Sequence, residues 1–322
     1  MRERWLPHFP NYERARGVEE VTPDIREHEF MERFVLRHHP CVVRGGAKHW
    51  PAVGKWNVAV LRASAGDMPV GTDYGFRFEP IPLYSLDMVV DVFSPLNGPM
   101  TLGAFLDQVE DEHHPYIQLN SEPIARFREL ADDVGGFTFF DLEKHPARFY
   151  PDRLFLARAG YTDWHVHTGD ETFTAQVCSP KEFLILPPDQ ATFDAIAPMA
   201  RRGVWRIPPV YWPKSFAELV PYRVTLEPGD VIYIPMHWWH AAESTDNGLN
   251  VTIAHCFRTP VRWLSDLRLP NARFSVLINA GLSALLSAAA RDARPLARAL
   301  RLAAMTVGGF PVSLFHNRRV EW

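Results

Sequence analysis

Short apolar runs separated by turn residues dominate the middle of the chain. Their β-branched and aromatic residues predict strands at 153–158, 163–168, 171–177, 182–187, 222–227, 230–235, 239–244 and 249–257. Because these strands follow one another through turns rather than helices, they favour a sandwich or barrel over a parallel sheet with crossover connections. Residues 189–220 interrupt the series with little periodicity, and a long insertion inside a barrel is typical of a lid or substrate loop.

Helical patterns lie on both sides of these strands. Thr22, Asn57 and Thr101 are residues of the N-cap type and predict helix starts in the first half of the chain. After Pro260 the apolar spacing predicts helices at about 262–267, 273–291 and 295–306. We therefore expect a mainly β protein with flanking helices, divided into flanking helices and strands at 1–150, a core at 151–258 and a C-terminal helical segment at 259–322.

The C-terminal helices carry one apolar stripe each. The first stripe contains Leu282, Leu285, Leu286 and Ala289, and the second contains Leu296, Leu300 and Ala303. Two short helices that are apolar on one side need a partner surface, so we expect a homodimer through them. The alternative is that they pack back on their own barrel.

Composition narrows the possible classes of protein. With 47% hydrophobic and 12% aromatic residues, the chain is globular rather than disordered. A net charge of −4 argues against general nucleic-acid binding. No segment reaches the about 20 apolar residues that a membrane span needs. Three cysteines, an odd number, indicate free thiols, and the first ten residues lack the apolar core of a signal peptide, so we expect a cytoplasmic protein without a membrane partner.

Three histidines in two motifs carry the candidate chemistry. His165 and His167 alternate in a predicted strand, so both side chains can point to one face. His240 follows the turn and strand Gly229–Pro235, which would bring a third imidazole to the same cavity. Imidazole ligands suit iron, zinc, copper or nickel. The alternative is that His165 and His167 are strand histidines packed in a polar core.

Several stretches resemble the cupin-like, or JmjC, branch of the iron(II)- and 2-oxoglutarate-dependent oxygenases. They are Pro40–Arg44, Trp50–Trp56, Gly229–Met236 and Trp238–His240. The similarity is greatest to the branch that hydroxylates asparagine in hypoxia-inducible factor. The resemblance implies a double-stranded β-helix, or jelly-roll, core whose two facing sheets enclose the site.

The same resemblance implies roles for individual residues. His165 and His240 match the first and last iron(II) ligands, while Thr162, Lys181 and Tyr116 match residues that bind the cosubstrate 2-oxoglutarate. A buried dicarboxylate needs a cation and hydroxyl donors, which agrees with these residue types. The implied activity is hydroxylation of a small-molecule, peptide or carrier-bound substrate.

The chain also departs from the family pattern. His167 stands where the family has its carboxylate ligand, so iron would sit on three histidines unless a local bulge brings in Asp170 or Glu171. We favour His167, because a spacing of two along a strand keeps the same face. Thr172 and His255 stand where asparagines are expected beside the cosubstrate.

Two other classes of function stay open at this stage. One is a 2-oxoglutarate-independent cupin metalloenzyme, a dioxygenase or isomerase, that uses Glu171 as a fourth ligand. The other is a non-catalytic binding protein on the same core. Four residues close to the ligands in sequence either line the substrate side or are core aromatics: Trp164, His237, Trp238 and Trp239.

Overall fold

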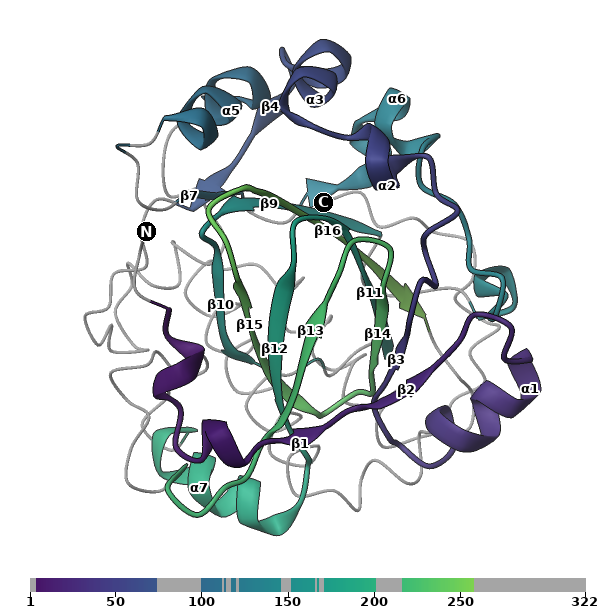
Figure 1. Cartoon of the computed structure of the whole chain (residues 1–322), viewed down its shortest axis with the longest axis vertical. Helices are drawn as coiled ribbons and strands as arrows, with labels where there is room; N and C mark the ends of the chain where they lie inside the picture. Colours follow the sequence, from purple (N-terminus) through teal and green to yellow (C-terminus); the bar gives the residue numbers. More distant parts are fainter. Residues whose placement is uncertain are drawn as a thin grey trace, which may run out of the picture.

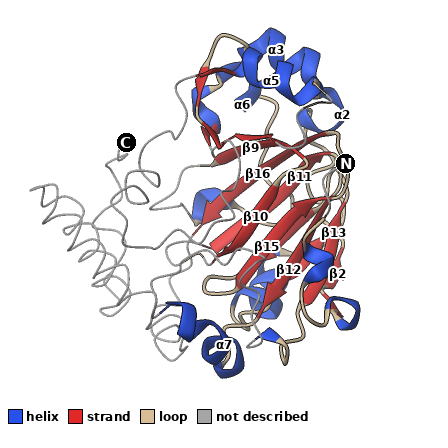
Figure 2. Ribbon diagram, turned by 90° about the vertical axis from the view of Figure 1, so that its left-hand side faces the viewer, coloured by secondary structure: helices blue, strands red, loops and turns tan. Residues whose placement is uncertain are grey.

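Two facing β-sheets form the centre of the molecule, as the strand pattern predicts. The computed structural model describes residues 4–73, 100–111, 113, 117–119, 122–145, 152–165, 167, 171–200 and 216–257. Short helices gather at one end of the sheets, while further helices and the segment near the N-terminus lie toward the other end (Figure 1). A view from the side shows the strands running between these two ends (Figure 2). This is the expected jelly-roll core with flanking helices.

The first sheet, which we call sheet A, carries most of the candidate site. Its strand order is β1-β13-β12-β15-β10. The bounds are β1 (Arg16–Gly17), β13 (Tyr222–Leu226), β12 (Lys181–Leu186), β15 (Trp239–Ser244) and β10 (Tyr161–His165). β10 ends at His165, three residues before the predicted end at 168, whereas β15 has the predicted bounds.

The second sheet, sheet B, contains strands from both halves of the chain. Its order is β2-β3-β14-β11-β16-β9-β7-β5, with β8 also paired to β9. The bounds are β2 (Glu19–Val21), β3 (Cys41–Val43), β14 (Val231–Ile234), β11 (Glu171–Cys178), β16 (Leu249–Phe257), β9 (Arg153–Arg158), β7 (Ile117–Leu119), β5 (Thr72–Asp73) and β8 (Glu122–Pro123). β4 (Pro69–Val70) and β6 (Met100–Thr101) form a separate pair. Strands before residue 150 therefore extend the same sheets as the later ones.

The helices are short, and two begin where the sequence predicts. The α-helices are α1 (Glu27–Phe30), α2 (Ala52–Lys55), α3 (Val58–Ala65), α5 (Leu102–Glu110), α6 (Arg128–Ala131) and α7 (Gln190–Ala200). The 3-10 turns are η1 (Leu6–His8), η2 (Tyr12–Arg14), η4 (Ile124–Arg126) and η5 (Leu142–Lys144), and η3 (Met31–Val35) is a π-helical turn after α1.

Side-chain capping explains which helix starts were predicted correctly. The Asn57 side chain accepts a hydrogen bond from Val60 N at 3.0 Å, which caps α3 as predicted. Thr101 caps α5 in the same way. The start predicted at Thr22 is wrong, because its hydroxyl donates to Asp24 and the helix begins only at Glu27.

Three hydrophobic clusters define the inner and outer faces of the sheets. The inner cluster, between the sheets, contains Val18, Val42, Phe183, Ile185, Val224, Leu226, Ile232, Ile234, Trp238 and Ala242. The outer cluster of sheet A contains Leu6, Phe9, Tyr12, Tyr161, Trp164, Leu184, Leu186, Ala195, Ile196, Phe216, Leu219, Trp239 and Ala241. The outer cluster of sheet B joins its strands to the helices and includes Phe30, Phe105, Phe173, Tyr233, Ile253 and Phe257. Alternate residues of each strand thus face opposite clusters.

Some expected features lie outside the described residues. These are Tyr116, Asp170, the C-terminal helices after residue 259 and the homodimer that they were expected to form. Of the insertion at 189–220, the described helix α7 packs Ala195 and Ile196 into the outer cluster of sheet A. This part of the insertion therefore covers an outer face. None of the described helices is long and apolar enough to span a membrane.

Candidate metal centre

Three imidazoles converge at the inner face of sheet A. One ring nitrogen from each of His165, His167 and His240 lies within 4.8 Å of the other two. The ring centroids of His165 and His240 are 4.1 Å apart, and that of His167 lies 4.8 Å from His240. Donor atoms this close, on three rings that are tilted relative to one another, can face a common point, as metal coordination requires.

Strand pairing explains the positions of His165 and His240. The two residues lie directly opposite each other in the antiparallel pair β10–β15. Residues opposite each other in a sheet share a face, and the next inward residue of β15, Ala242, belongs to the inner cluster. Both imidazoles therefore point between the sheets.

A β-bulge brings Thr162 to the same face as His165. Thr162 lies opposite Ala242 and His165 opposite His240, so three steps along β10 match two steps along β15. Residues three apart in a regular strand face opposite sides, and the extra residue of a bulge corrects this. Tyr161 and Trp164, also three apart, both belong to the outer cluster of sheet A.

His167 reaches the centre by a route that the alternation argument did not predict. It lies beyond the end of β10, and its carbonyl oxygen accepts a hydrogen bond from His237 N at 2.8 Å. Its Nδ1 lies 2.8 Å from the Thr172 hydroxyl oxygen on β11. Contacts to two other segments, rather than the period of its own strand, thus hold His167 beside His165.

The surroundings favour neutral imidazoles with an available Nε2. His240 Nδ1 lies 3.0 Å from the carbonyl oxygen of Trp238, which acts as an acceptor and so places the ring proton on Nδ1. Burial lowers the pKa of His240 to about 4. Burial lowers the pKa of His167 to about 3, and repulsion from His240 in its protonated form acts in the same direction. Metal ligation requires this unprotonated form of histidine.

Glu171 points away from the three histidines. It shares the face of β11 that carries Phe173, and its Oε2 accepts a hydrogen bond from the Tyr233 hydroxyl at 2.5 Å. Phe173 and Tyr233 belong to the outer cluster of sheet B. A carboxylate on that face cannot reach the cavity between the sheets without reversing the register of β11.

Lys181 is a buried cation on the inner face. Its side chain is 9% exposed, and Nζ contacts the Thr252 hydroxyl oxygen at 3.3 Å. Among the described residues no carboxylate is paired with it, and burial lowers its pKa to about 8. An unpaired buried charge is costly, so the arrangement suits an anionic ligand.

Lys181 and His240 lie at different heights along the same inner face of sheet A. Lys181 lies opposite Ser244, four residues beyond His240 on the same face of β15. At about 3.3 Å per residue, the two backbone positions are roughly 13 Å apart. Lys181 and His240 both project from this face into the space between the sheets.

Other sequence candidates do not join this centre. His255 packs between the rings of Trp50 and Phe137, on the outer side of sheet B. Trp164 and Trp239 lie in the outer cluster of sheet A and Trp238 in the inner cluster, so these residues are core aromatics.

Sequence reasoning missed part of the polar lining. Gln176 Oε1 accepts a hydrogen bond from the Thr252 hydroxyl, next to Lys181. Thr172, Thr174 and Gln176 alternate along β11, as do Asn250 and Thr252 along β16. Polar residues at a period of two within otherwise apolar strands were the available signal, because they mark a polar inner face.

Comparisons with known proteins agree with the fold. Residues 27–262 match the family model described as "Cupin-like domain". The chain is 25% identical over 254 residues to the bifunctional arginine demethylase and lysyl-hydroxylase psr-1 of Caenorhabditis elegans, covering 71% of this chain and 58% of that protein. It is 20% identical over 252 residues to the human bifunctional peptidase and (3S)-lysyl hydroxylase JMJD7, covering 69% and 78%.

A third relative carries a name from a different process. The chain is 25% identical over 245 residues to the mouse tRNA wybutosine-synthesizing protein 5, covering 71% of this chain and 75% of that protein. This chain thus spans only 58% of the length of the psr-1 protein of Caenorhabditis elegans, and more of the human and mouse proteins.

Proposed function

This chain belongs to the cupin-like (JmjC) domain family, and we propose that it is an iron(II)- and 2-oxoglutarate-dependent oxygenase. Its activity would be hydroxylation of a small metabolite, a peptide or a carrier-bound substrate. One observation carries the proposal: three imidazoles converge at the inner face of sheet A, and the buried cation Lys181, which has no carboxylate partner among the described residues, lies further along that face. Relatives named as lysyl-hydroxylases support a peptide side chain as the substrate.

The histidines and Lys181 would have separate roles. His165, His167 and His240 would hold iron(II), which supplies the capacity to activate dioxygen for oxidation of a C–H bond. Because three neutral imidazoles add no negative charge, the centre would attract the anionic end of 2-oxoglutarate strongly. Lys181 would pair with the distal carboxylate, and Thr162 offers a hydroxyl donor on the same inner face. Tyr116, outside the described residues, is proposed for the same carboxylate.

Anaerobic titration tests the proposed function directly. We expect the protein to bind one equivalent of iron(II), and addition of 2-oxoglutarate to give a charge-transfer absorption band. Admission of dioxygen should then convert 2-oxoglutarate to succinate. Failure to bind iron(II) at micromolar concentration would favour a binding protein on a cupin core. Oxidative turnover without 2-oxoglutarate would favour the simpler cupin metalloenzyme.

Replacing Lys181 by methionine should stabilise the cosubstrate-free protein at pH 7. The ordinary lysine pKa of 10.5 falls to about 8 in the folded protein, so the unfolded chain binds the proton more tightly. The resulting penalty of about 3 kcal/mol is fully present below pH 8 and disappears as pH rises from 8 to 10.5. Urea denaturation of both proteins across this pH range should show a stability difference that narrows above pH 8.

The same variant also tests the proposed role of Lys181. With iron(II) under nitrogen, 2-oxoglutarate should raise the unfolding temperature of the unmodified protein but not of Lys181→Met. The matched control is Lys48→Met, since Lys48 is exposed and its replacement should change neither stability nor the cosubstrate response. A Lys181→Met protein that is less stable, yet still stabilised by 2-oxoglutarate, would contradict the assignment.

Two further parts of the proposal concern the whole protein. We keep the C-terminal homodimer as a proposal, which sedimentation of Leu285→Asp combined with Leu300→Asp would test. We also keep a cytoplasmic location as a proposal, which the odd number of three cysteines favours.

A further inference from the structure

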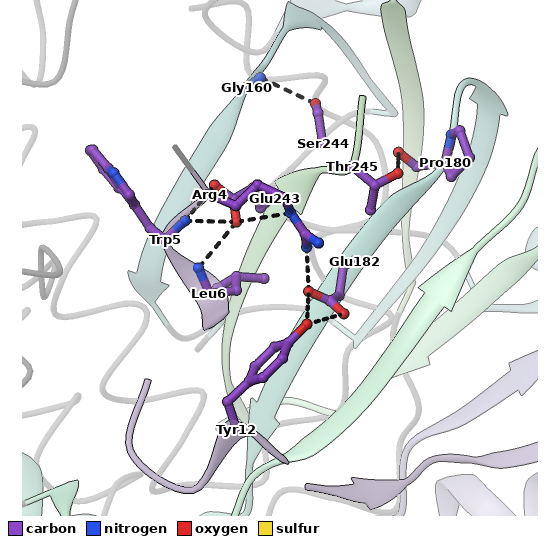
Figure 3. A network of polar contacts seen from close by, with 10 residues as sticks. All are labelled: Arg4, Trp5, Leu6, Tyr12, Gly160, Pro180, Glu182, Glu243, Ser244 and Thr245. Carbon is purple, nitrogen blue, oxygen red and sulfur yellow. Dashed lines mark hydrogen bonds and ion pairs between the residues drawn. The ribbon is translucent and has the colours of Figure 1, made fainter. Parts of the chain in front are cut away.

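An N-terminal arm, residues 4–14, lies on the outer face of sheet A, behind the candidate centre. Leu6, Phe9 and Tyr12 of the arm are buried in the outer cluster of that sheet. Its polar groups contact Glu182 on β12 and Glu243 on β15 (Figure 3). These two strands carry Lys181 and His240 on their opposite face.

The arm supplies a cation and hydrogen-bond donors to two buried carboxylates that lie side by side. Glu182 and Glu243 are directly opposite in the β12–β15 pair and are 5% and 0% exposed. Like charges at such a pair of positions are destabilising without compensation. Arg4 lies between them, 2.5 Å from Glu182 Oε2 and 3.6 Å from Glu243 Oε2, as Figure 3 shows.

Further donors from the arm complete this anchor. Trp5 N and Leu6 N donate to the Glu243 carboxylate at 2.9 and 3.1 Å. The Tyr12 hydroxyl donates to Glu182 Oε1 at 2.9 Å. Hydrogen bonds to buried charged acceptors are stronger than neutral ones, so the arm is attached firmly to both strands.

The aromatic residues of the arm also contact β10 at its bulge and next to it. The ring of Trp5 packs edge-on against Tyr161 at 4.7 Å, and Phe9 packs against Trp164 at 5.0 Å. Tyr161 immediately precedes the irregular stretch between Thr162 and His165, and Trp164 lies within that stretch. β10 is the last strand of sheet A, and within the described residues no strand pairs with its other edge.

We propose that the N-terminal arm is a positioning clamp for the metal centre, which fixes the bulge of β10 from the outer face. An edge strand is held by hydrogen bonds to one neighbour only, so packing on its outer face helps to fix its register, and a one-residue slip would move every side chain to the opposite face. If the bulge shifted along β10, Thr162 and His165 would no longer share the inner face with His240. This inference rests on the proposed function, because it assigns the arm to the same centre.

Metal affinity of the full-length chain tests the clamp. Cobalt(II) serves as the probe, with its absorption spectrum and dissociation constant as readouts. We expect Trp5→Ala combined with Phe9→Ala to weaken cobalt(II) binding by about tenfold or more, as changes beside a ligand commonly do. Trp5→Phe combined with Phe9→Leu keeps apolar contacts and should restore most of the affinity.

A variant that loses similar stability at a site outside sheet A shows whether weaker cobalt(II) binding comes from a displaced ligand or from a generally less stable fold. Leu106→Ala removes a fully buried side chain of α5, in the outer cluster of sheet B. It should lower the unfolding temperature yet change cobalt(II) affinity less than about twofold. If the arm variants bind cobalt(II) as tightly as the unmodified protein, the clamp is refuted while the proposed function stands. If the unmodified protein does not bind cobalt(II), the result contradicts the proposed function, and the clamp proposal that rests on it falls as well.

Hydrogen exchange tests the clamp without any metal. In the metal-free protein, the arm variant should exchange the β10 amides at 161–165 at least about tenfold faster, because its bulge opens more often. Arg4→Gln should act in the same direction, and adding Glu182→Gln should reverse it by removing the facing charge. Unchanged exchange in β10 for both variants would overturn the proposal, as would a failure of Glu182→Gln to reverse the effect of Arg4→Gln.

Discussion

Replacing His240 by alanine is expected to abolish stoichiometric iron(II) binding while the fold remains intact. His240 lies directly opposite His165 and beside His167, so its loss leaves two imidazoles and an open side of the centre. We expect the dissociation constant to rise by roughly a hundredfold or more, since removing a ligand costs more than disturbing its neighbours. Anaerobic titration and circular dichroism, on the same sample, measure both parts of this expectation.

His237→Asn is the matched control for His240→Ala. His237 is also buried and lies in the turn before β15, but its ring is not among the three that converge. Its φ of 65° is left-handed, and asparagine tolerates that conformation while keeping the N–H that His167 accepts. Iron(II) affinity should stay within about twofold. Tight binding by His240→Ala, or equal losses in both variants, would contradict the assignment.

The second large effect separates His167 from the nearby carboxylates. His167→Ala is expected to weaken iron(II) binding by roughly a hundredfold, because its ring completes the group of three. Glu171→Gln should leave the affinity almost unchanged, since that side chain faces the outer cluster of sheet B. Iron(II) titration of both variants under the same conditions shows which of them loses more iron(II) affinity.

Glu171→Gln should instead lower the stability of the fold. It weakens a charge-assisted hydrogen bond of 2.5 Å from Tyr233, and such bonds contribute about 1.5–3 kcal/mol. Tyr233→Phe removes the donor of the same bond and should reduce the free energy of unfolding similarly. A larger loss of iron(II) affinity in Asp170→Asn than in His167→Ala would restore a carboxylate ligand and refute the three-histidine centre.

Much of the secondary structure follows from local signals. The bounds of β9, β15 and β16 agree with the apolar runs, because turn residues on both sides end each strand. Asn57 and Thr101 cap helices through bonds to residues three positions away. Where a side chain had another local partner, as Thr22 has in Asp24, the same reasoning predicted the wrong start. The cupin-like family also follows from the sequence, through the motif that ends at His240.

The composition of the centre depended on contacts between distant segments. The sequence alone identified His165, His167 and His240 as candidates through residue type and motif spacing, and Lys181 through the resemblance to the cupin-like family. Only the register of β10 on β15 decided that Thr162 shares a face with His165, and only the pairing of β11 decided that Glu171 does not.

The N-terminal arm shows most clearly that sequence alone does not reveal which distant segments come into contact. Its residues contact strands more than 150 positions later, and no local pattern in them indicates which face they cover. A side chain's direction depends on strand register, and register depends on the packing of the whole sheet. For this reason the sequence determined which residues bear the chemistry, whereas the tertiary structure decided which of them face one another.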